Sequence, residues 1–285
     1  MLKQPATYAE QIAKLREHGC VVSDEVFCEE ILSQVSYYRL SAYFLPFRMA
    51  DGKYRSGTEF SRVYRFYELD RKLRSILFLT VEEIEVFLRA QFSYYHAHKY
   101  GSDGYTDAIN FNSRHDHGNF MARVAETLKN NDKVTFVQHH MNKYNGDFPI
   151  WVLMELFTFG MLSYFYADLT ICDQKQLAKD MFGTVPKNIK SWLHCCTVLR
   201  NICAHYGRLY YRVFTAIPAG LPEVDKTAER KLFAVIIALR QLYPNIGKWN
   251  NEILPSIAAL IEQYTEVIDL RHIGFPENWE DIIQK

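Results

Sequence analysis

The 285-residue sequence has few residues that break regular structure, and it lacks the motifs of several common enzyme classes. Only 13 Gly and 9 Pro are present, too few for a loop-rich β-sandwich or a collagen-like chain. No Walker motif, Rossmann fingerprint or Gly-x-Ser-x-Gly elbow occurs, which argues against ATP hydrolysis and serine hydrolase chemistry. Net charge is also absent, because 33 Lys and Arg balance 33 Asp and Glu. A uniformly basic, nucleic-acid-coating protein is therefore excluded, although a local basic patch is not.

The sequence also lacks a recognisable signal peptide and a convincing membrane span. The first ten residues have no apolar stretch of the kind that a signal needs. The most apolar window, Phe148–Ala167, is interrupted by Glu155 and has no flanking Lys or Arg, so we expect a buried helix there. Glu155 should then be buried and paired with a base from residues 36–74 or with Arg200, more as a structural ion pair than as a catalytic group. We expect a cytoplasmic protein without membrane contact, whose six Cys are free thiols.

Helical patterns dominate what is present. Hydrophobic residues make up 48% of the chain, and they recur at the three-four spacing of buried helix faces. Thr7-x-x-Glu10 has the form of a capping box for a helix that ends at Gly19, and Ser23 is expected to cap the next helix. From Thr58 to Lys99 there is no Pro or Gly, which predicts one long helix or two nearly coaxial ones.

We predict an all-α protein from these patterns. Residues 100–119, rich in Gly, Asp and Asn, are expected to form a loop. The only strand-like alternation is at 211–217. We expect an N-terminal helical extension over 1–55 and a helical domain over 56–285, packed as one compact unit. Further helices are predicted over 118–130, 133–144, 149–168, 173–182, 186–206, 227–243 and 248–268, and after Pro276.

Two basic segments stand out in this neutral chain. Residues 181–222 contain no carboxylate but five Lys and Arg, and residues 36–74 have nine bases against four acids. Bases interleaved with tyrosines suit phosphate neutralisation together with base stacking. Ordinary surface residues whose stems cover apolar area would give the same pattern. We therefore predict RNA contacts, and no DNA partner, at these residues: Lys187, Lys190, Arg208, Arg212, Tyr206, Tyr210, Arg39, Arg71 and Arg74.

An Arg and a His flank the end of the helix predicted over 186–206. Arg200 and His205 are separated by four residues, and Gly207 follows. These groups suffice in principle to cleave RNA without a metal. Histidine can transfer protons near neutral pH, and a guanidinium can stabilise the charge of the phosphorane. Asn201, which shares a helix face with His205, could orient the imidazole or the substrate.

A single histidine is poorly suited to act as base and acid at once. We therefore expect a homodimer in which His205 of both copies reaches a shared cleft. Spacing alone does not decide between catalysis and a structural histidine, because an Arg-x4-His pattern occurs by chance in many chains.

The sequence resembles the abortive-infection (AbiD/AbiF-like) family of bacterial phage-defence proteins. Residues 199–205, Leu-Arg-Asn-Ile-Cys-Ala-His, are similar to the Arg-polar-x3-His motif of HEPN-fold ribonucleases. The resemblance spans roughly residues 8–212 in the expected order. Its mild departure is Ala42, where Gly is common. The other matching segments are Tyr38–Phe47, Tyr67–Arg74, Glu82–Arg89, and Pro149–Trp151 with Glu155, Phe159 and Gly160.

This resemblance implies a HEPN-like helical bundle, dimerisation and a toxin-like, metal-independent endoribonuclease that restricts phage by degrading RNA and uses no cofactor. Arg200 and His205 would be the catalytic pair, with Asn201 as the polar neighbour. Some relatives associate with a small non-coding RNA, so a non-catalytic protein that holds a structured RNA is the alternative.

Other candidate sites have simpler explanations. Cys196 and Cys203 are too far apart along a helix for a zinc knuckle, so we expect no metal there. His115 and His117 can chelate in principle, but a solvated loop is the commoner explanation. The aromatic run Tyr37–Phe47 is expected to pack in the core, with RNA stacking as the alternative.

Overall fold

The computed structural model describes residues 4–284, and its axis is the helix α4 (Phe60–Tyr100). This helix has 41 residues and is therefore about 60 Å long. It is continuous, so the long-helix prediction is confirmed and the alternative of two coaxial helices is not needed. The buried face of α4 includes Leu69, Leu73, Leu77, Ile84 and Leu88, at the spacing that the sequence shows. Helices α3, α7, α8, α10, α11 and α13 pack directly on α4.

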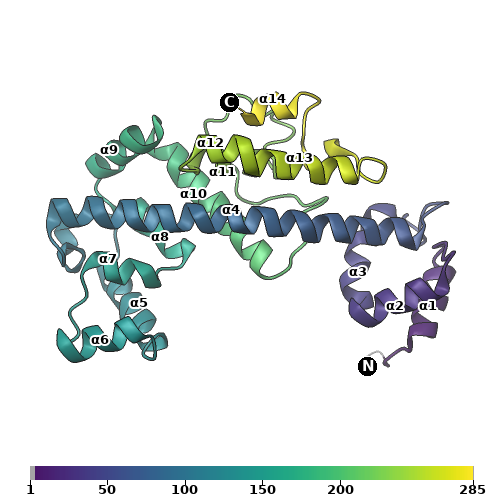
Figure 1. The fold of residues 1–285 in the computed structure, drawn as a ribbon, viewed down its shortest axis with the longest axis horizontal. Helices are drawn as coiled ribbons and strands as arrows, with labels where there is room; N and C mark the ends of the chain where they lie inside the picture. The colour runs from purple at the N-terminus through teal and green to yellow at the C-terminus, as the bar shows by residue number, and fades with distance from the viewer. Residues whose placement is uncertain (1–3, 285) are drawn as a thin grey trace.

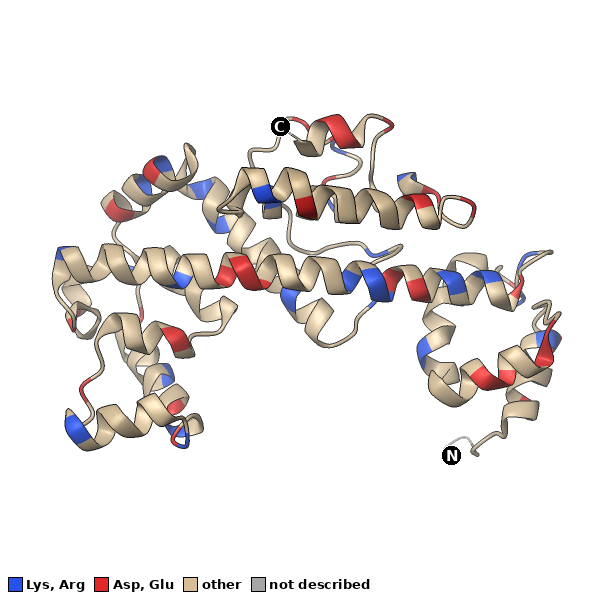
Figure 2. Cartoon of the chain, in the orientation of Figure 1, with Lys and Arg blue, Asp and Glu red and all other residues tan. Residues whose placement is uncertain are grey.

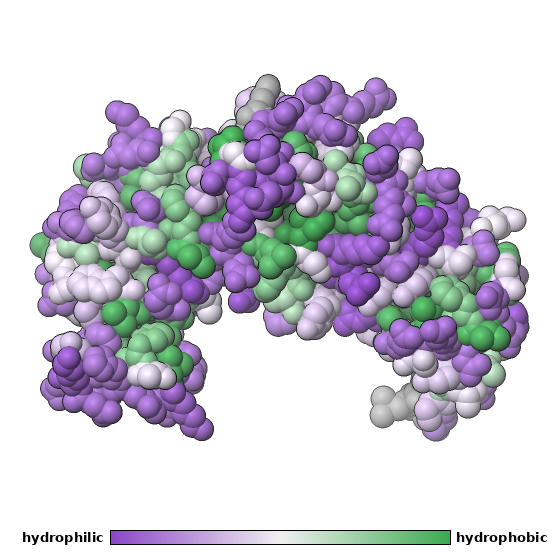
Figure 3. All heavy atoms as spheres, viewed as in Figure 1, coloured by the Kyte–Doolittle hydropathy of each residue, from purple (hydrophilic) through white to green (hydrophobic). Residues whose placement is uncertain are grey.

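Two groups of helices lie at the two ends of α4, on the same side of it (Figure 1). The first group is α1 (Tyr8–Glu17), α2 (Glu25–Gln34) and α3 (Tyr37–Phe44), which lies at the N-terminal end of α4. The second is α5 (His117–Asn130), α6 (Thr135–Lys143) and α7 (Ile150–Leu153), at the other end. The molecule is therefore arched, and Figure 3 shows the hollow between the two groups.

The remaining helices fill the centre of the arch. Helix α10 crosses α4 and packs on α8 and α11, and its C-terminal end emerges on the hollow side (Figure 1). Helix α11 is buried on all its faces, as expected for a helix with almost no polar residue. The bounds of this group are α8 (Phe159–Asp168), α9 (Ile171–Phe182), α10 (Pro186–Ala204), α11 (Leu232–Leu242), α12 (Ile246–Lys248), α13 (Leu254–Gln263) and α14 (Trp279–Gln284).

Short helices connect these elements. The prediction of an all-α protein is confirmed, because residues 4–284 form no β-strand and only isolated bridges. The strand-like stretch 211–217 is an irregular loop. The 3₁₀ helices are η1 (Leu45–Phe47), η2 (Gly104–Thr106), η3 (Ala108–Asn110), η4 (Met154–Leu156) and η6 (Leu270–Ile273), and η5 (Trp249–Ile253) is a π-helix.

The caps at the N-terminal end were predicted in part. The capping box is present, since Thr7 and Glu10 satisfy each other's backbone amides. The next helix is capped by Asp24 and not by Ser23, because the Asp24 carboxylate accepts a hydrogen bond from the amide of Phe27 at 2.9 Å. Ser and Asp are both good cap residues, so the sequence could not separate two adjacent candidates.

The apolar window over 149–168 is not one helix. It is divided into α7, η4 and α8, and the hydroxyl of Thr158 caps α8 by accepting from the amide of Met161. This break turns Glu155 outward, so its side chain is 59% exposed and lies 3.8 Å from Arg89. The expectation of a buried Glu155 paired with residues 36–74 or Arg200 is therefore wrong. Within residues 4–284, each helix is too short or too polar to cross a bilayer.

A buried histidine lies near the C-terminal end of α4. His96 is fully buried among Tyr100, Phe111 and Phe165, and neither ring nitrogen has a hydrogen-bond partner. Burial lowers the pKa of His96 from 6.5 to about 4, although the charge of Asp173 opposes this. The ring is therefore neutral in the folded protein at neutral pH.

This histidine should make the fold sensitive to acid. Below pH 6.5 the unfolded chain binds a proton at His96, whereas the folded chain binds it only near pH 4. The free energy of unfolding is therefore unaffected by His96 above pH 6.5. Between pH 6.5 and pH 4 it falls by about 3 kcal/mol because of this residue. Urea unfolding of the wild type and of a His96→Phe variant tests this. The variant should depend less on pH across this window, and equal dependence in both proteins would contradict the assignment.

Candidate functional site

A basic pocket of about 560 Å³ lies on the hollow side, where α3, α4 and the end of α10 meet. Three arginines and three aromatic residues line it. Arg39 comes from α3, while Arg71 and Arg74 come from α4. The aromatic residues are Tyr67, Phe78 and Tyr206, and Ser75, Cys203 and Ala204 complete the lining. The two basic segments of the sequence therefore meet in one place.

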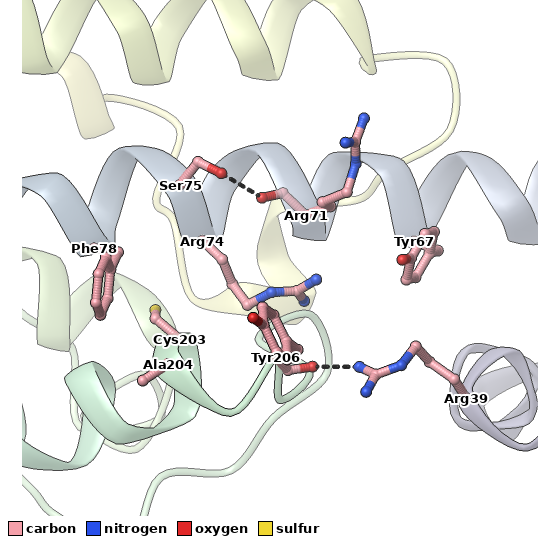
Figure 4. Close-up of a pocket in the computed structure, with 9 residues that line it drawn as sticks. All are labelled: Arg39, Tyr67, Arg71, Arg74, Ser75, Phe78, Cys203, Ala204 and Tyr206. Atoms are coloured by element: carbon pink, nitrogen blue, oxygen red, sulfur yellow. Dashed lines mark hydrogen bonds between the residues drawn. The ribbon is translucent and has the colours of Figure 1, made fainter. Parts of the chain in front are cut away.

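Figure 4 shows how these side chains are arranged. Arg39 reaches across from α3, and its Nη1 donates to the backbone carbonyl of Tyr206 at 2.9 Å. Arg74 extends from α4 over the same residue, whereas Arg71 points toward the opposite side of the helix. Lys and Arg also follow one another along the N-terminal half of α4 (Figure 2). This part of the molecule is suited to a polyanion.

The base of the pocket is a buried ionic network around Asp70. Its carboxylate accepts hydrogen bonds from the amides of Leu209 and Tyr210, both at 2.8 Å. It also accepts from the hydroxyl of Tyr43 at 2.8 Å and from Nη1 of Arg74 at 3.0 Å. Burial raises the pKa of Asp70, while these donors act in the opposite direction. Because amides and a guanidinium can only donate, the network fits the ionised carboxylate.

Several arginines fix the loop that follows α10. Arg74 donates to the carbonyl of Gly207 at 3.1 Å, and Arg208 donates to the carbonyl of Ala42 in α3. With Arg39 and Asp70, these contacts tie the loop at 206–210 to both α3 and α4. The segment directly after His205 is therefore held rigidly against two other helices.

Helix α10 ends in a C-terminal capping motif with an unusual residue in its left-handed position. The amide of Gly207 bonds to the carbonyl of Ile202 at 2.7 Å, and the amide of Tyr206 bonds to that of Cys203 at 3.1 Å, which is the Schellman pattern. The left-handed position in this pattern normally holds Gly, but here Tyr206 occupies it with φ of 56°. Tyr206 is 66% exposed. A strained backbone that presents an aromatic ring at a pocket indicates a functional role for the ring.

Replacing Tyr206 by Gly separates stability from binding. The variant relieves the left-handed strain, so it should unfold no more easily than the wild type, with a gain of up to about 1 kcal/mol. If the ring stacks on a nucleobase, the affinity for single-stranded RNA should fall by about tenfold. Thermal unfolding and fluorescence anisotropy measure the two effects. Unchanged RNA affinity in a stably folded Y206G protein would exclude the stacking role.

The predicted catalytic residues lie at the same end of α10, but they line different surfaces. His205 is the exposed C-terminal cap residue, and its amide bonds to the carbonyl of Asn201 at 3.0 Å. Asn201 is also exposed, while Arg200 is half-buried. Arg200 lines a separate groove of about 350 Å³ against α4 with Glu82, Glu85 and Arg89. The structure therefore brings Arg200 and His205 to one helix end without directing them into one cavity.

The groove and the basic pocket are neighbours, because Phe78 lines both. Nη2 of Arg89 donates hydrogen bonds to Oε1 of Glu85 at 2.5 Å and to the carbonyl of Phe157 at 2.7 Å. The guanidinium of Arg200 has no hydrogen-bond or ion-pair partner among the described residues, although Glu82 and Glu85 line the same groove.

The other predicted RNA contacts are dispersed. Lys187 and Lys190 lie near the start of α10, about 20–25 Å of helix rise from its end, and they do not line the pocket. Arg212 is exposed in the loop beyond it. Tyr210 is buried with its ring stacked on Phe66 at 5.0 Å, so the expected stacking on RNA does not fit this residue.

Sequence reasoning missed Tyr67, Phe78 and Asp70. A signal existed for the first two, because Tyr67, Arg71, Arg74 and Phe78 recur at the three-four spacing of one helix face. The i,i+4 pair of Asp70 with Arg74 was visible in the sequence, but its burial beneath the loop after His205 was not.

The alternative sites can now be placed. Cys195, Cys196 and Cys203 are buried free thiols, and burial raises the pKa of Cys203 to about 12. In residues 4–284, no three His, Cys, Asp or Glu side chains are grouped for metal binding. His115 contacts Asp168 at 3.0 Å and His117 at 3.2 Å. In the run Tyr37–Phe47, Leu40, Tyr43 and Phe44 are buried, whereas Tyr38 is exposed.

Comparison with known proteins identifies the family but no individual relative. No curated protein and no solved structure matches the sequence. A family model described as Abi-like protein matches residues 30–211, which is well over half of the chain. The matched segment runs from α2 to the loop after α10 and includes the basic pocket, Arg200 and His205. The chain therefore belongs to the Abi-like family of abortive-infection proteins.

Proposed function

We propose that this protein is an endoribonuclease of phage defence, with Arg200 and His205 as its catalytic pair and Asn201 as their polar neighbour. The proposal rests chiefly on the position of this pair at the end of α10, beside a pocket lined by three arginines and the exposed residue Tyr206. Membership of the Abi-like family supports the role in abortive infection.

The proposed reaction needs no redox change and no added nucleophile. The ribose 2′-oxygen loses its proton to a base and forms a bond to the adjacent phosphorus. The bond from phosphorus to the 5′-oxygen then breaks, and an acid protonates this leaving oxygen. His205 is exposed and can transfer these protons. Arg200, with its unoccupied donors, would stabilise the doubly negative phosphorane.

Dimerisation completes this proposal. One copy supplies a single His205, which is exposed at the C-terminal end of α10, and Arg200 lines the neighbouring groove. A second copy that places its own α10 end against the first would provide a base and an acid on opposite sides of the phosphate. RNA bound in the pocket would contact Arg39 and Tyr206, whereas the largely buried Arg74 stays paired with Asp70.

A second function is favoured by one specific observation. Arg200 and His205 do not line the same cavity, whereas the basic pocket is complete within one chain. A protein that holds a structured RNA without cleaving it would need only the pocket.

One experiment separates these two functions. Purified protein is incubated in EDTA with single-stranded RNA and, separately, with any RNA that co-purifies from the native host. The nuclease proposal predicts that the added RNA is cut. If no RNA is cut and the co-purified RNA remains bound and intact, the protein is an RNA-binding module and the nuclease proposal is wrong.

A further inference from the structure

A second cavity, of about 960 Å³, lies at the far end of α4 from the basic pocket. It is formed by α5, α6 and the segments that flank them, in the second group of helices (Figure 1). Its volume falls in the range of sites for small organic molecules. The proposed ribonuclease reaction makes no use of it.

The floor and rim of this cavity are largely aromatic and apolar. Val124, Tyr105 and Phe148 are buried at its floor, and the Tyr105 hydroxyl donates to the carbonyl of Phe148 at 2.8 Å. Tyr144 and Trp151 are about half-exposed and form part of its wall. Such a surface binds the apolar body of a ligand.

The titratable side chains of the lining are two aspartates, two histidines and two tyrosines. Asp103 and Asp147 are the charged residues, and neither carboxylate has a hydrogen-bond or ion-pair partner among residues 4–284. Both carboxylates act on Tyr105, whose pKa is raised by burial first and then by these two charges. Both aspartates line this cavity, and both are exposed to solvent. No lysine or arginine belongs to the described lining.

Contacts with His140 hold the backbone around Asp147 in place. His140 contacts the backbone carbonyl of Asp147 through Nδ1 at 3.0 Å, and its ring stacks on Phe148 at 5.1 Å. Lys143 lies 5.2 Å from the centre of the Tyr144 ring but is not part of the lining. The cavity is thus pre-formed, with aromatic faces and uncompensated negative charge, which is the combination that recognises organic cations.

We propose that this cavity binds a small organic cation with an aromatic or aliphatic body. The body would pack on Phe148 and Val124, and the ammonium or guanidinium group would lie between Asp103 and Asp147. An anionic ligand such as an RNA phosphate would be repelled by these carboxylates. The proposal is independent of the ribonuclease function and concerns the opposite end of the molecule.

The probes are a matched pair that differ in charge, 2-phenylethylamine and 2-phenylethanol. Binding is followed by the fluorescence of Trp151, which is 49% exposed while the other three tryptophans are buried. A Trp151→Phe variant identifies that signal. Saturable binding of the amine is expected, at least about tenfold tighter than that of the alcohol. Asp103→Asn and Asp147→Asn should each weaken amine binding, whereas Asp132→Asn, at an exposed site outside the lining, should not.

Three results would overturn this inference. Equal affinity for the amine and the alcohol would show that charge is not recognised. Absence of saturable binding of either probe would exclude a small-molecule site. Binding of a peptide such as acetyl-Ala-Arg-Phe-amide, without binding of the free amine, would assign the cavity to a basic segment of a partner protein.

Discussion

Replacing Asp70 by alanine is expected to destabilise the protein by about 3–5 kcal/mol. The substitution leaves the buried guanidinium of Arg74 without its counter-ion and removes the acceptor for the amides of Leu209 and Tyr210. The melting temperature should fall by about 6–15 °C. Thermal and urea unfolding measure the effect.

The control for this prediction is an exposed ion pair. Arg16 and Glu25 lie 2.7 Å apart, with about half of each side chain exposed, so Glu25→Ala should cost less than about 1 kcal/mol. Asp70→Asn keeps the shape of the side chain but removes its charge, and it should fall between the two variants. If Asp70→Ala were no more harmful than Glu25→Ala, the network would not support the loop after His205.

Removing either member of the proposed catalytic pair should nearly abolish RNA cleavage. His205→Ala should reduce the cleavage rate by about 10²–10⁴-fold through loss of proton transfer. Arg200→Ala should reduce it by about 10²–10³-fold through loss of charge stabilisation in the transition state. Neither side chain is in the core, so both variants should fold. Single-turnover cleavage of a labelled RNA in EDTA measures these rates.

Two further variants make this prediction specific. His194 is an exposed histidine on the same helix, and His194→Ala should cleave at the wild-type rate. Arg200→Lys keeps the charge but loses the planar donors that match a phosphate, so it should restore little activity. If the Arg200→Ala and His205→Ala proteins both cut RNA normally, the active site lies elsewhere.

Much of the fold could be predicted because helical periodicity is a local property. The spacing of apolar residues between Thr58 and Lys99 predicted α4, and the Thr7 and Glu10 pattern predicted the first cap. The break at Thr158 was missed because a cap residue within an apolar run gives no clear signal. The outward turn of Glu155 follows from that break.

The site was harder to predict because it depends on contacts between distant segments. Sequence reasoning selected Arg39, Arg74 and Tyr206, and the structure brings them into one pocket. It did not indicate that Arg39 and Arg74 also bind the backbone of the loop after α10, or that Tyr210 is buried. The left-handed backbone of Tyr206 was also unforeseen. A glycine usually takes this position, and the sequence offers Gly207 one residue later.

The division into an extension over 1–55 and a domain over 56–285 remains a prediction. Helix α3 contributes Arg39 to the pocket and the carbonyl of Ala42 to Arg208. The N-terminal helices therefore take part in building the site. A protein that lacks them should lose the pocket as well as the contacts that hold the loop.

The chemistry of the cut ends tests the central proposal most directly. The protein is incubated with RNA in EDTA, and the termini of the fragments are determined by mass spectrometry. Attack by the ribose 2′-oxygen predicts 2′,3′-cyclic phosphate, or the 3′-phosphate formed from it, on one fragment and a 5′-hydroxyl on the other. Fragments that carry a 3′-hydroxyl and a 5′-phosphate, or RNA that remains uncut, would contradict it.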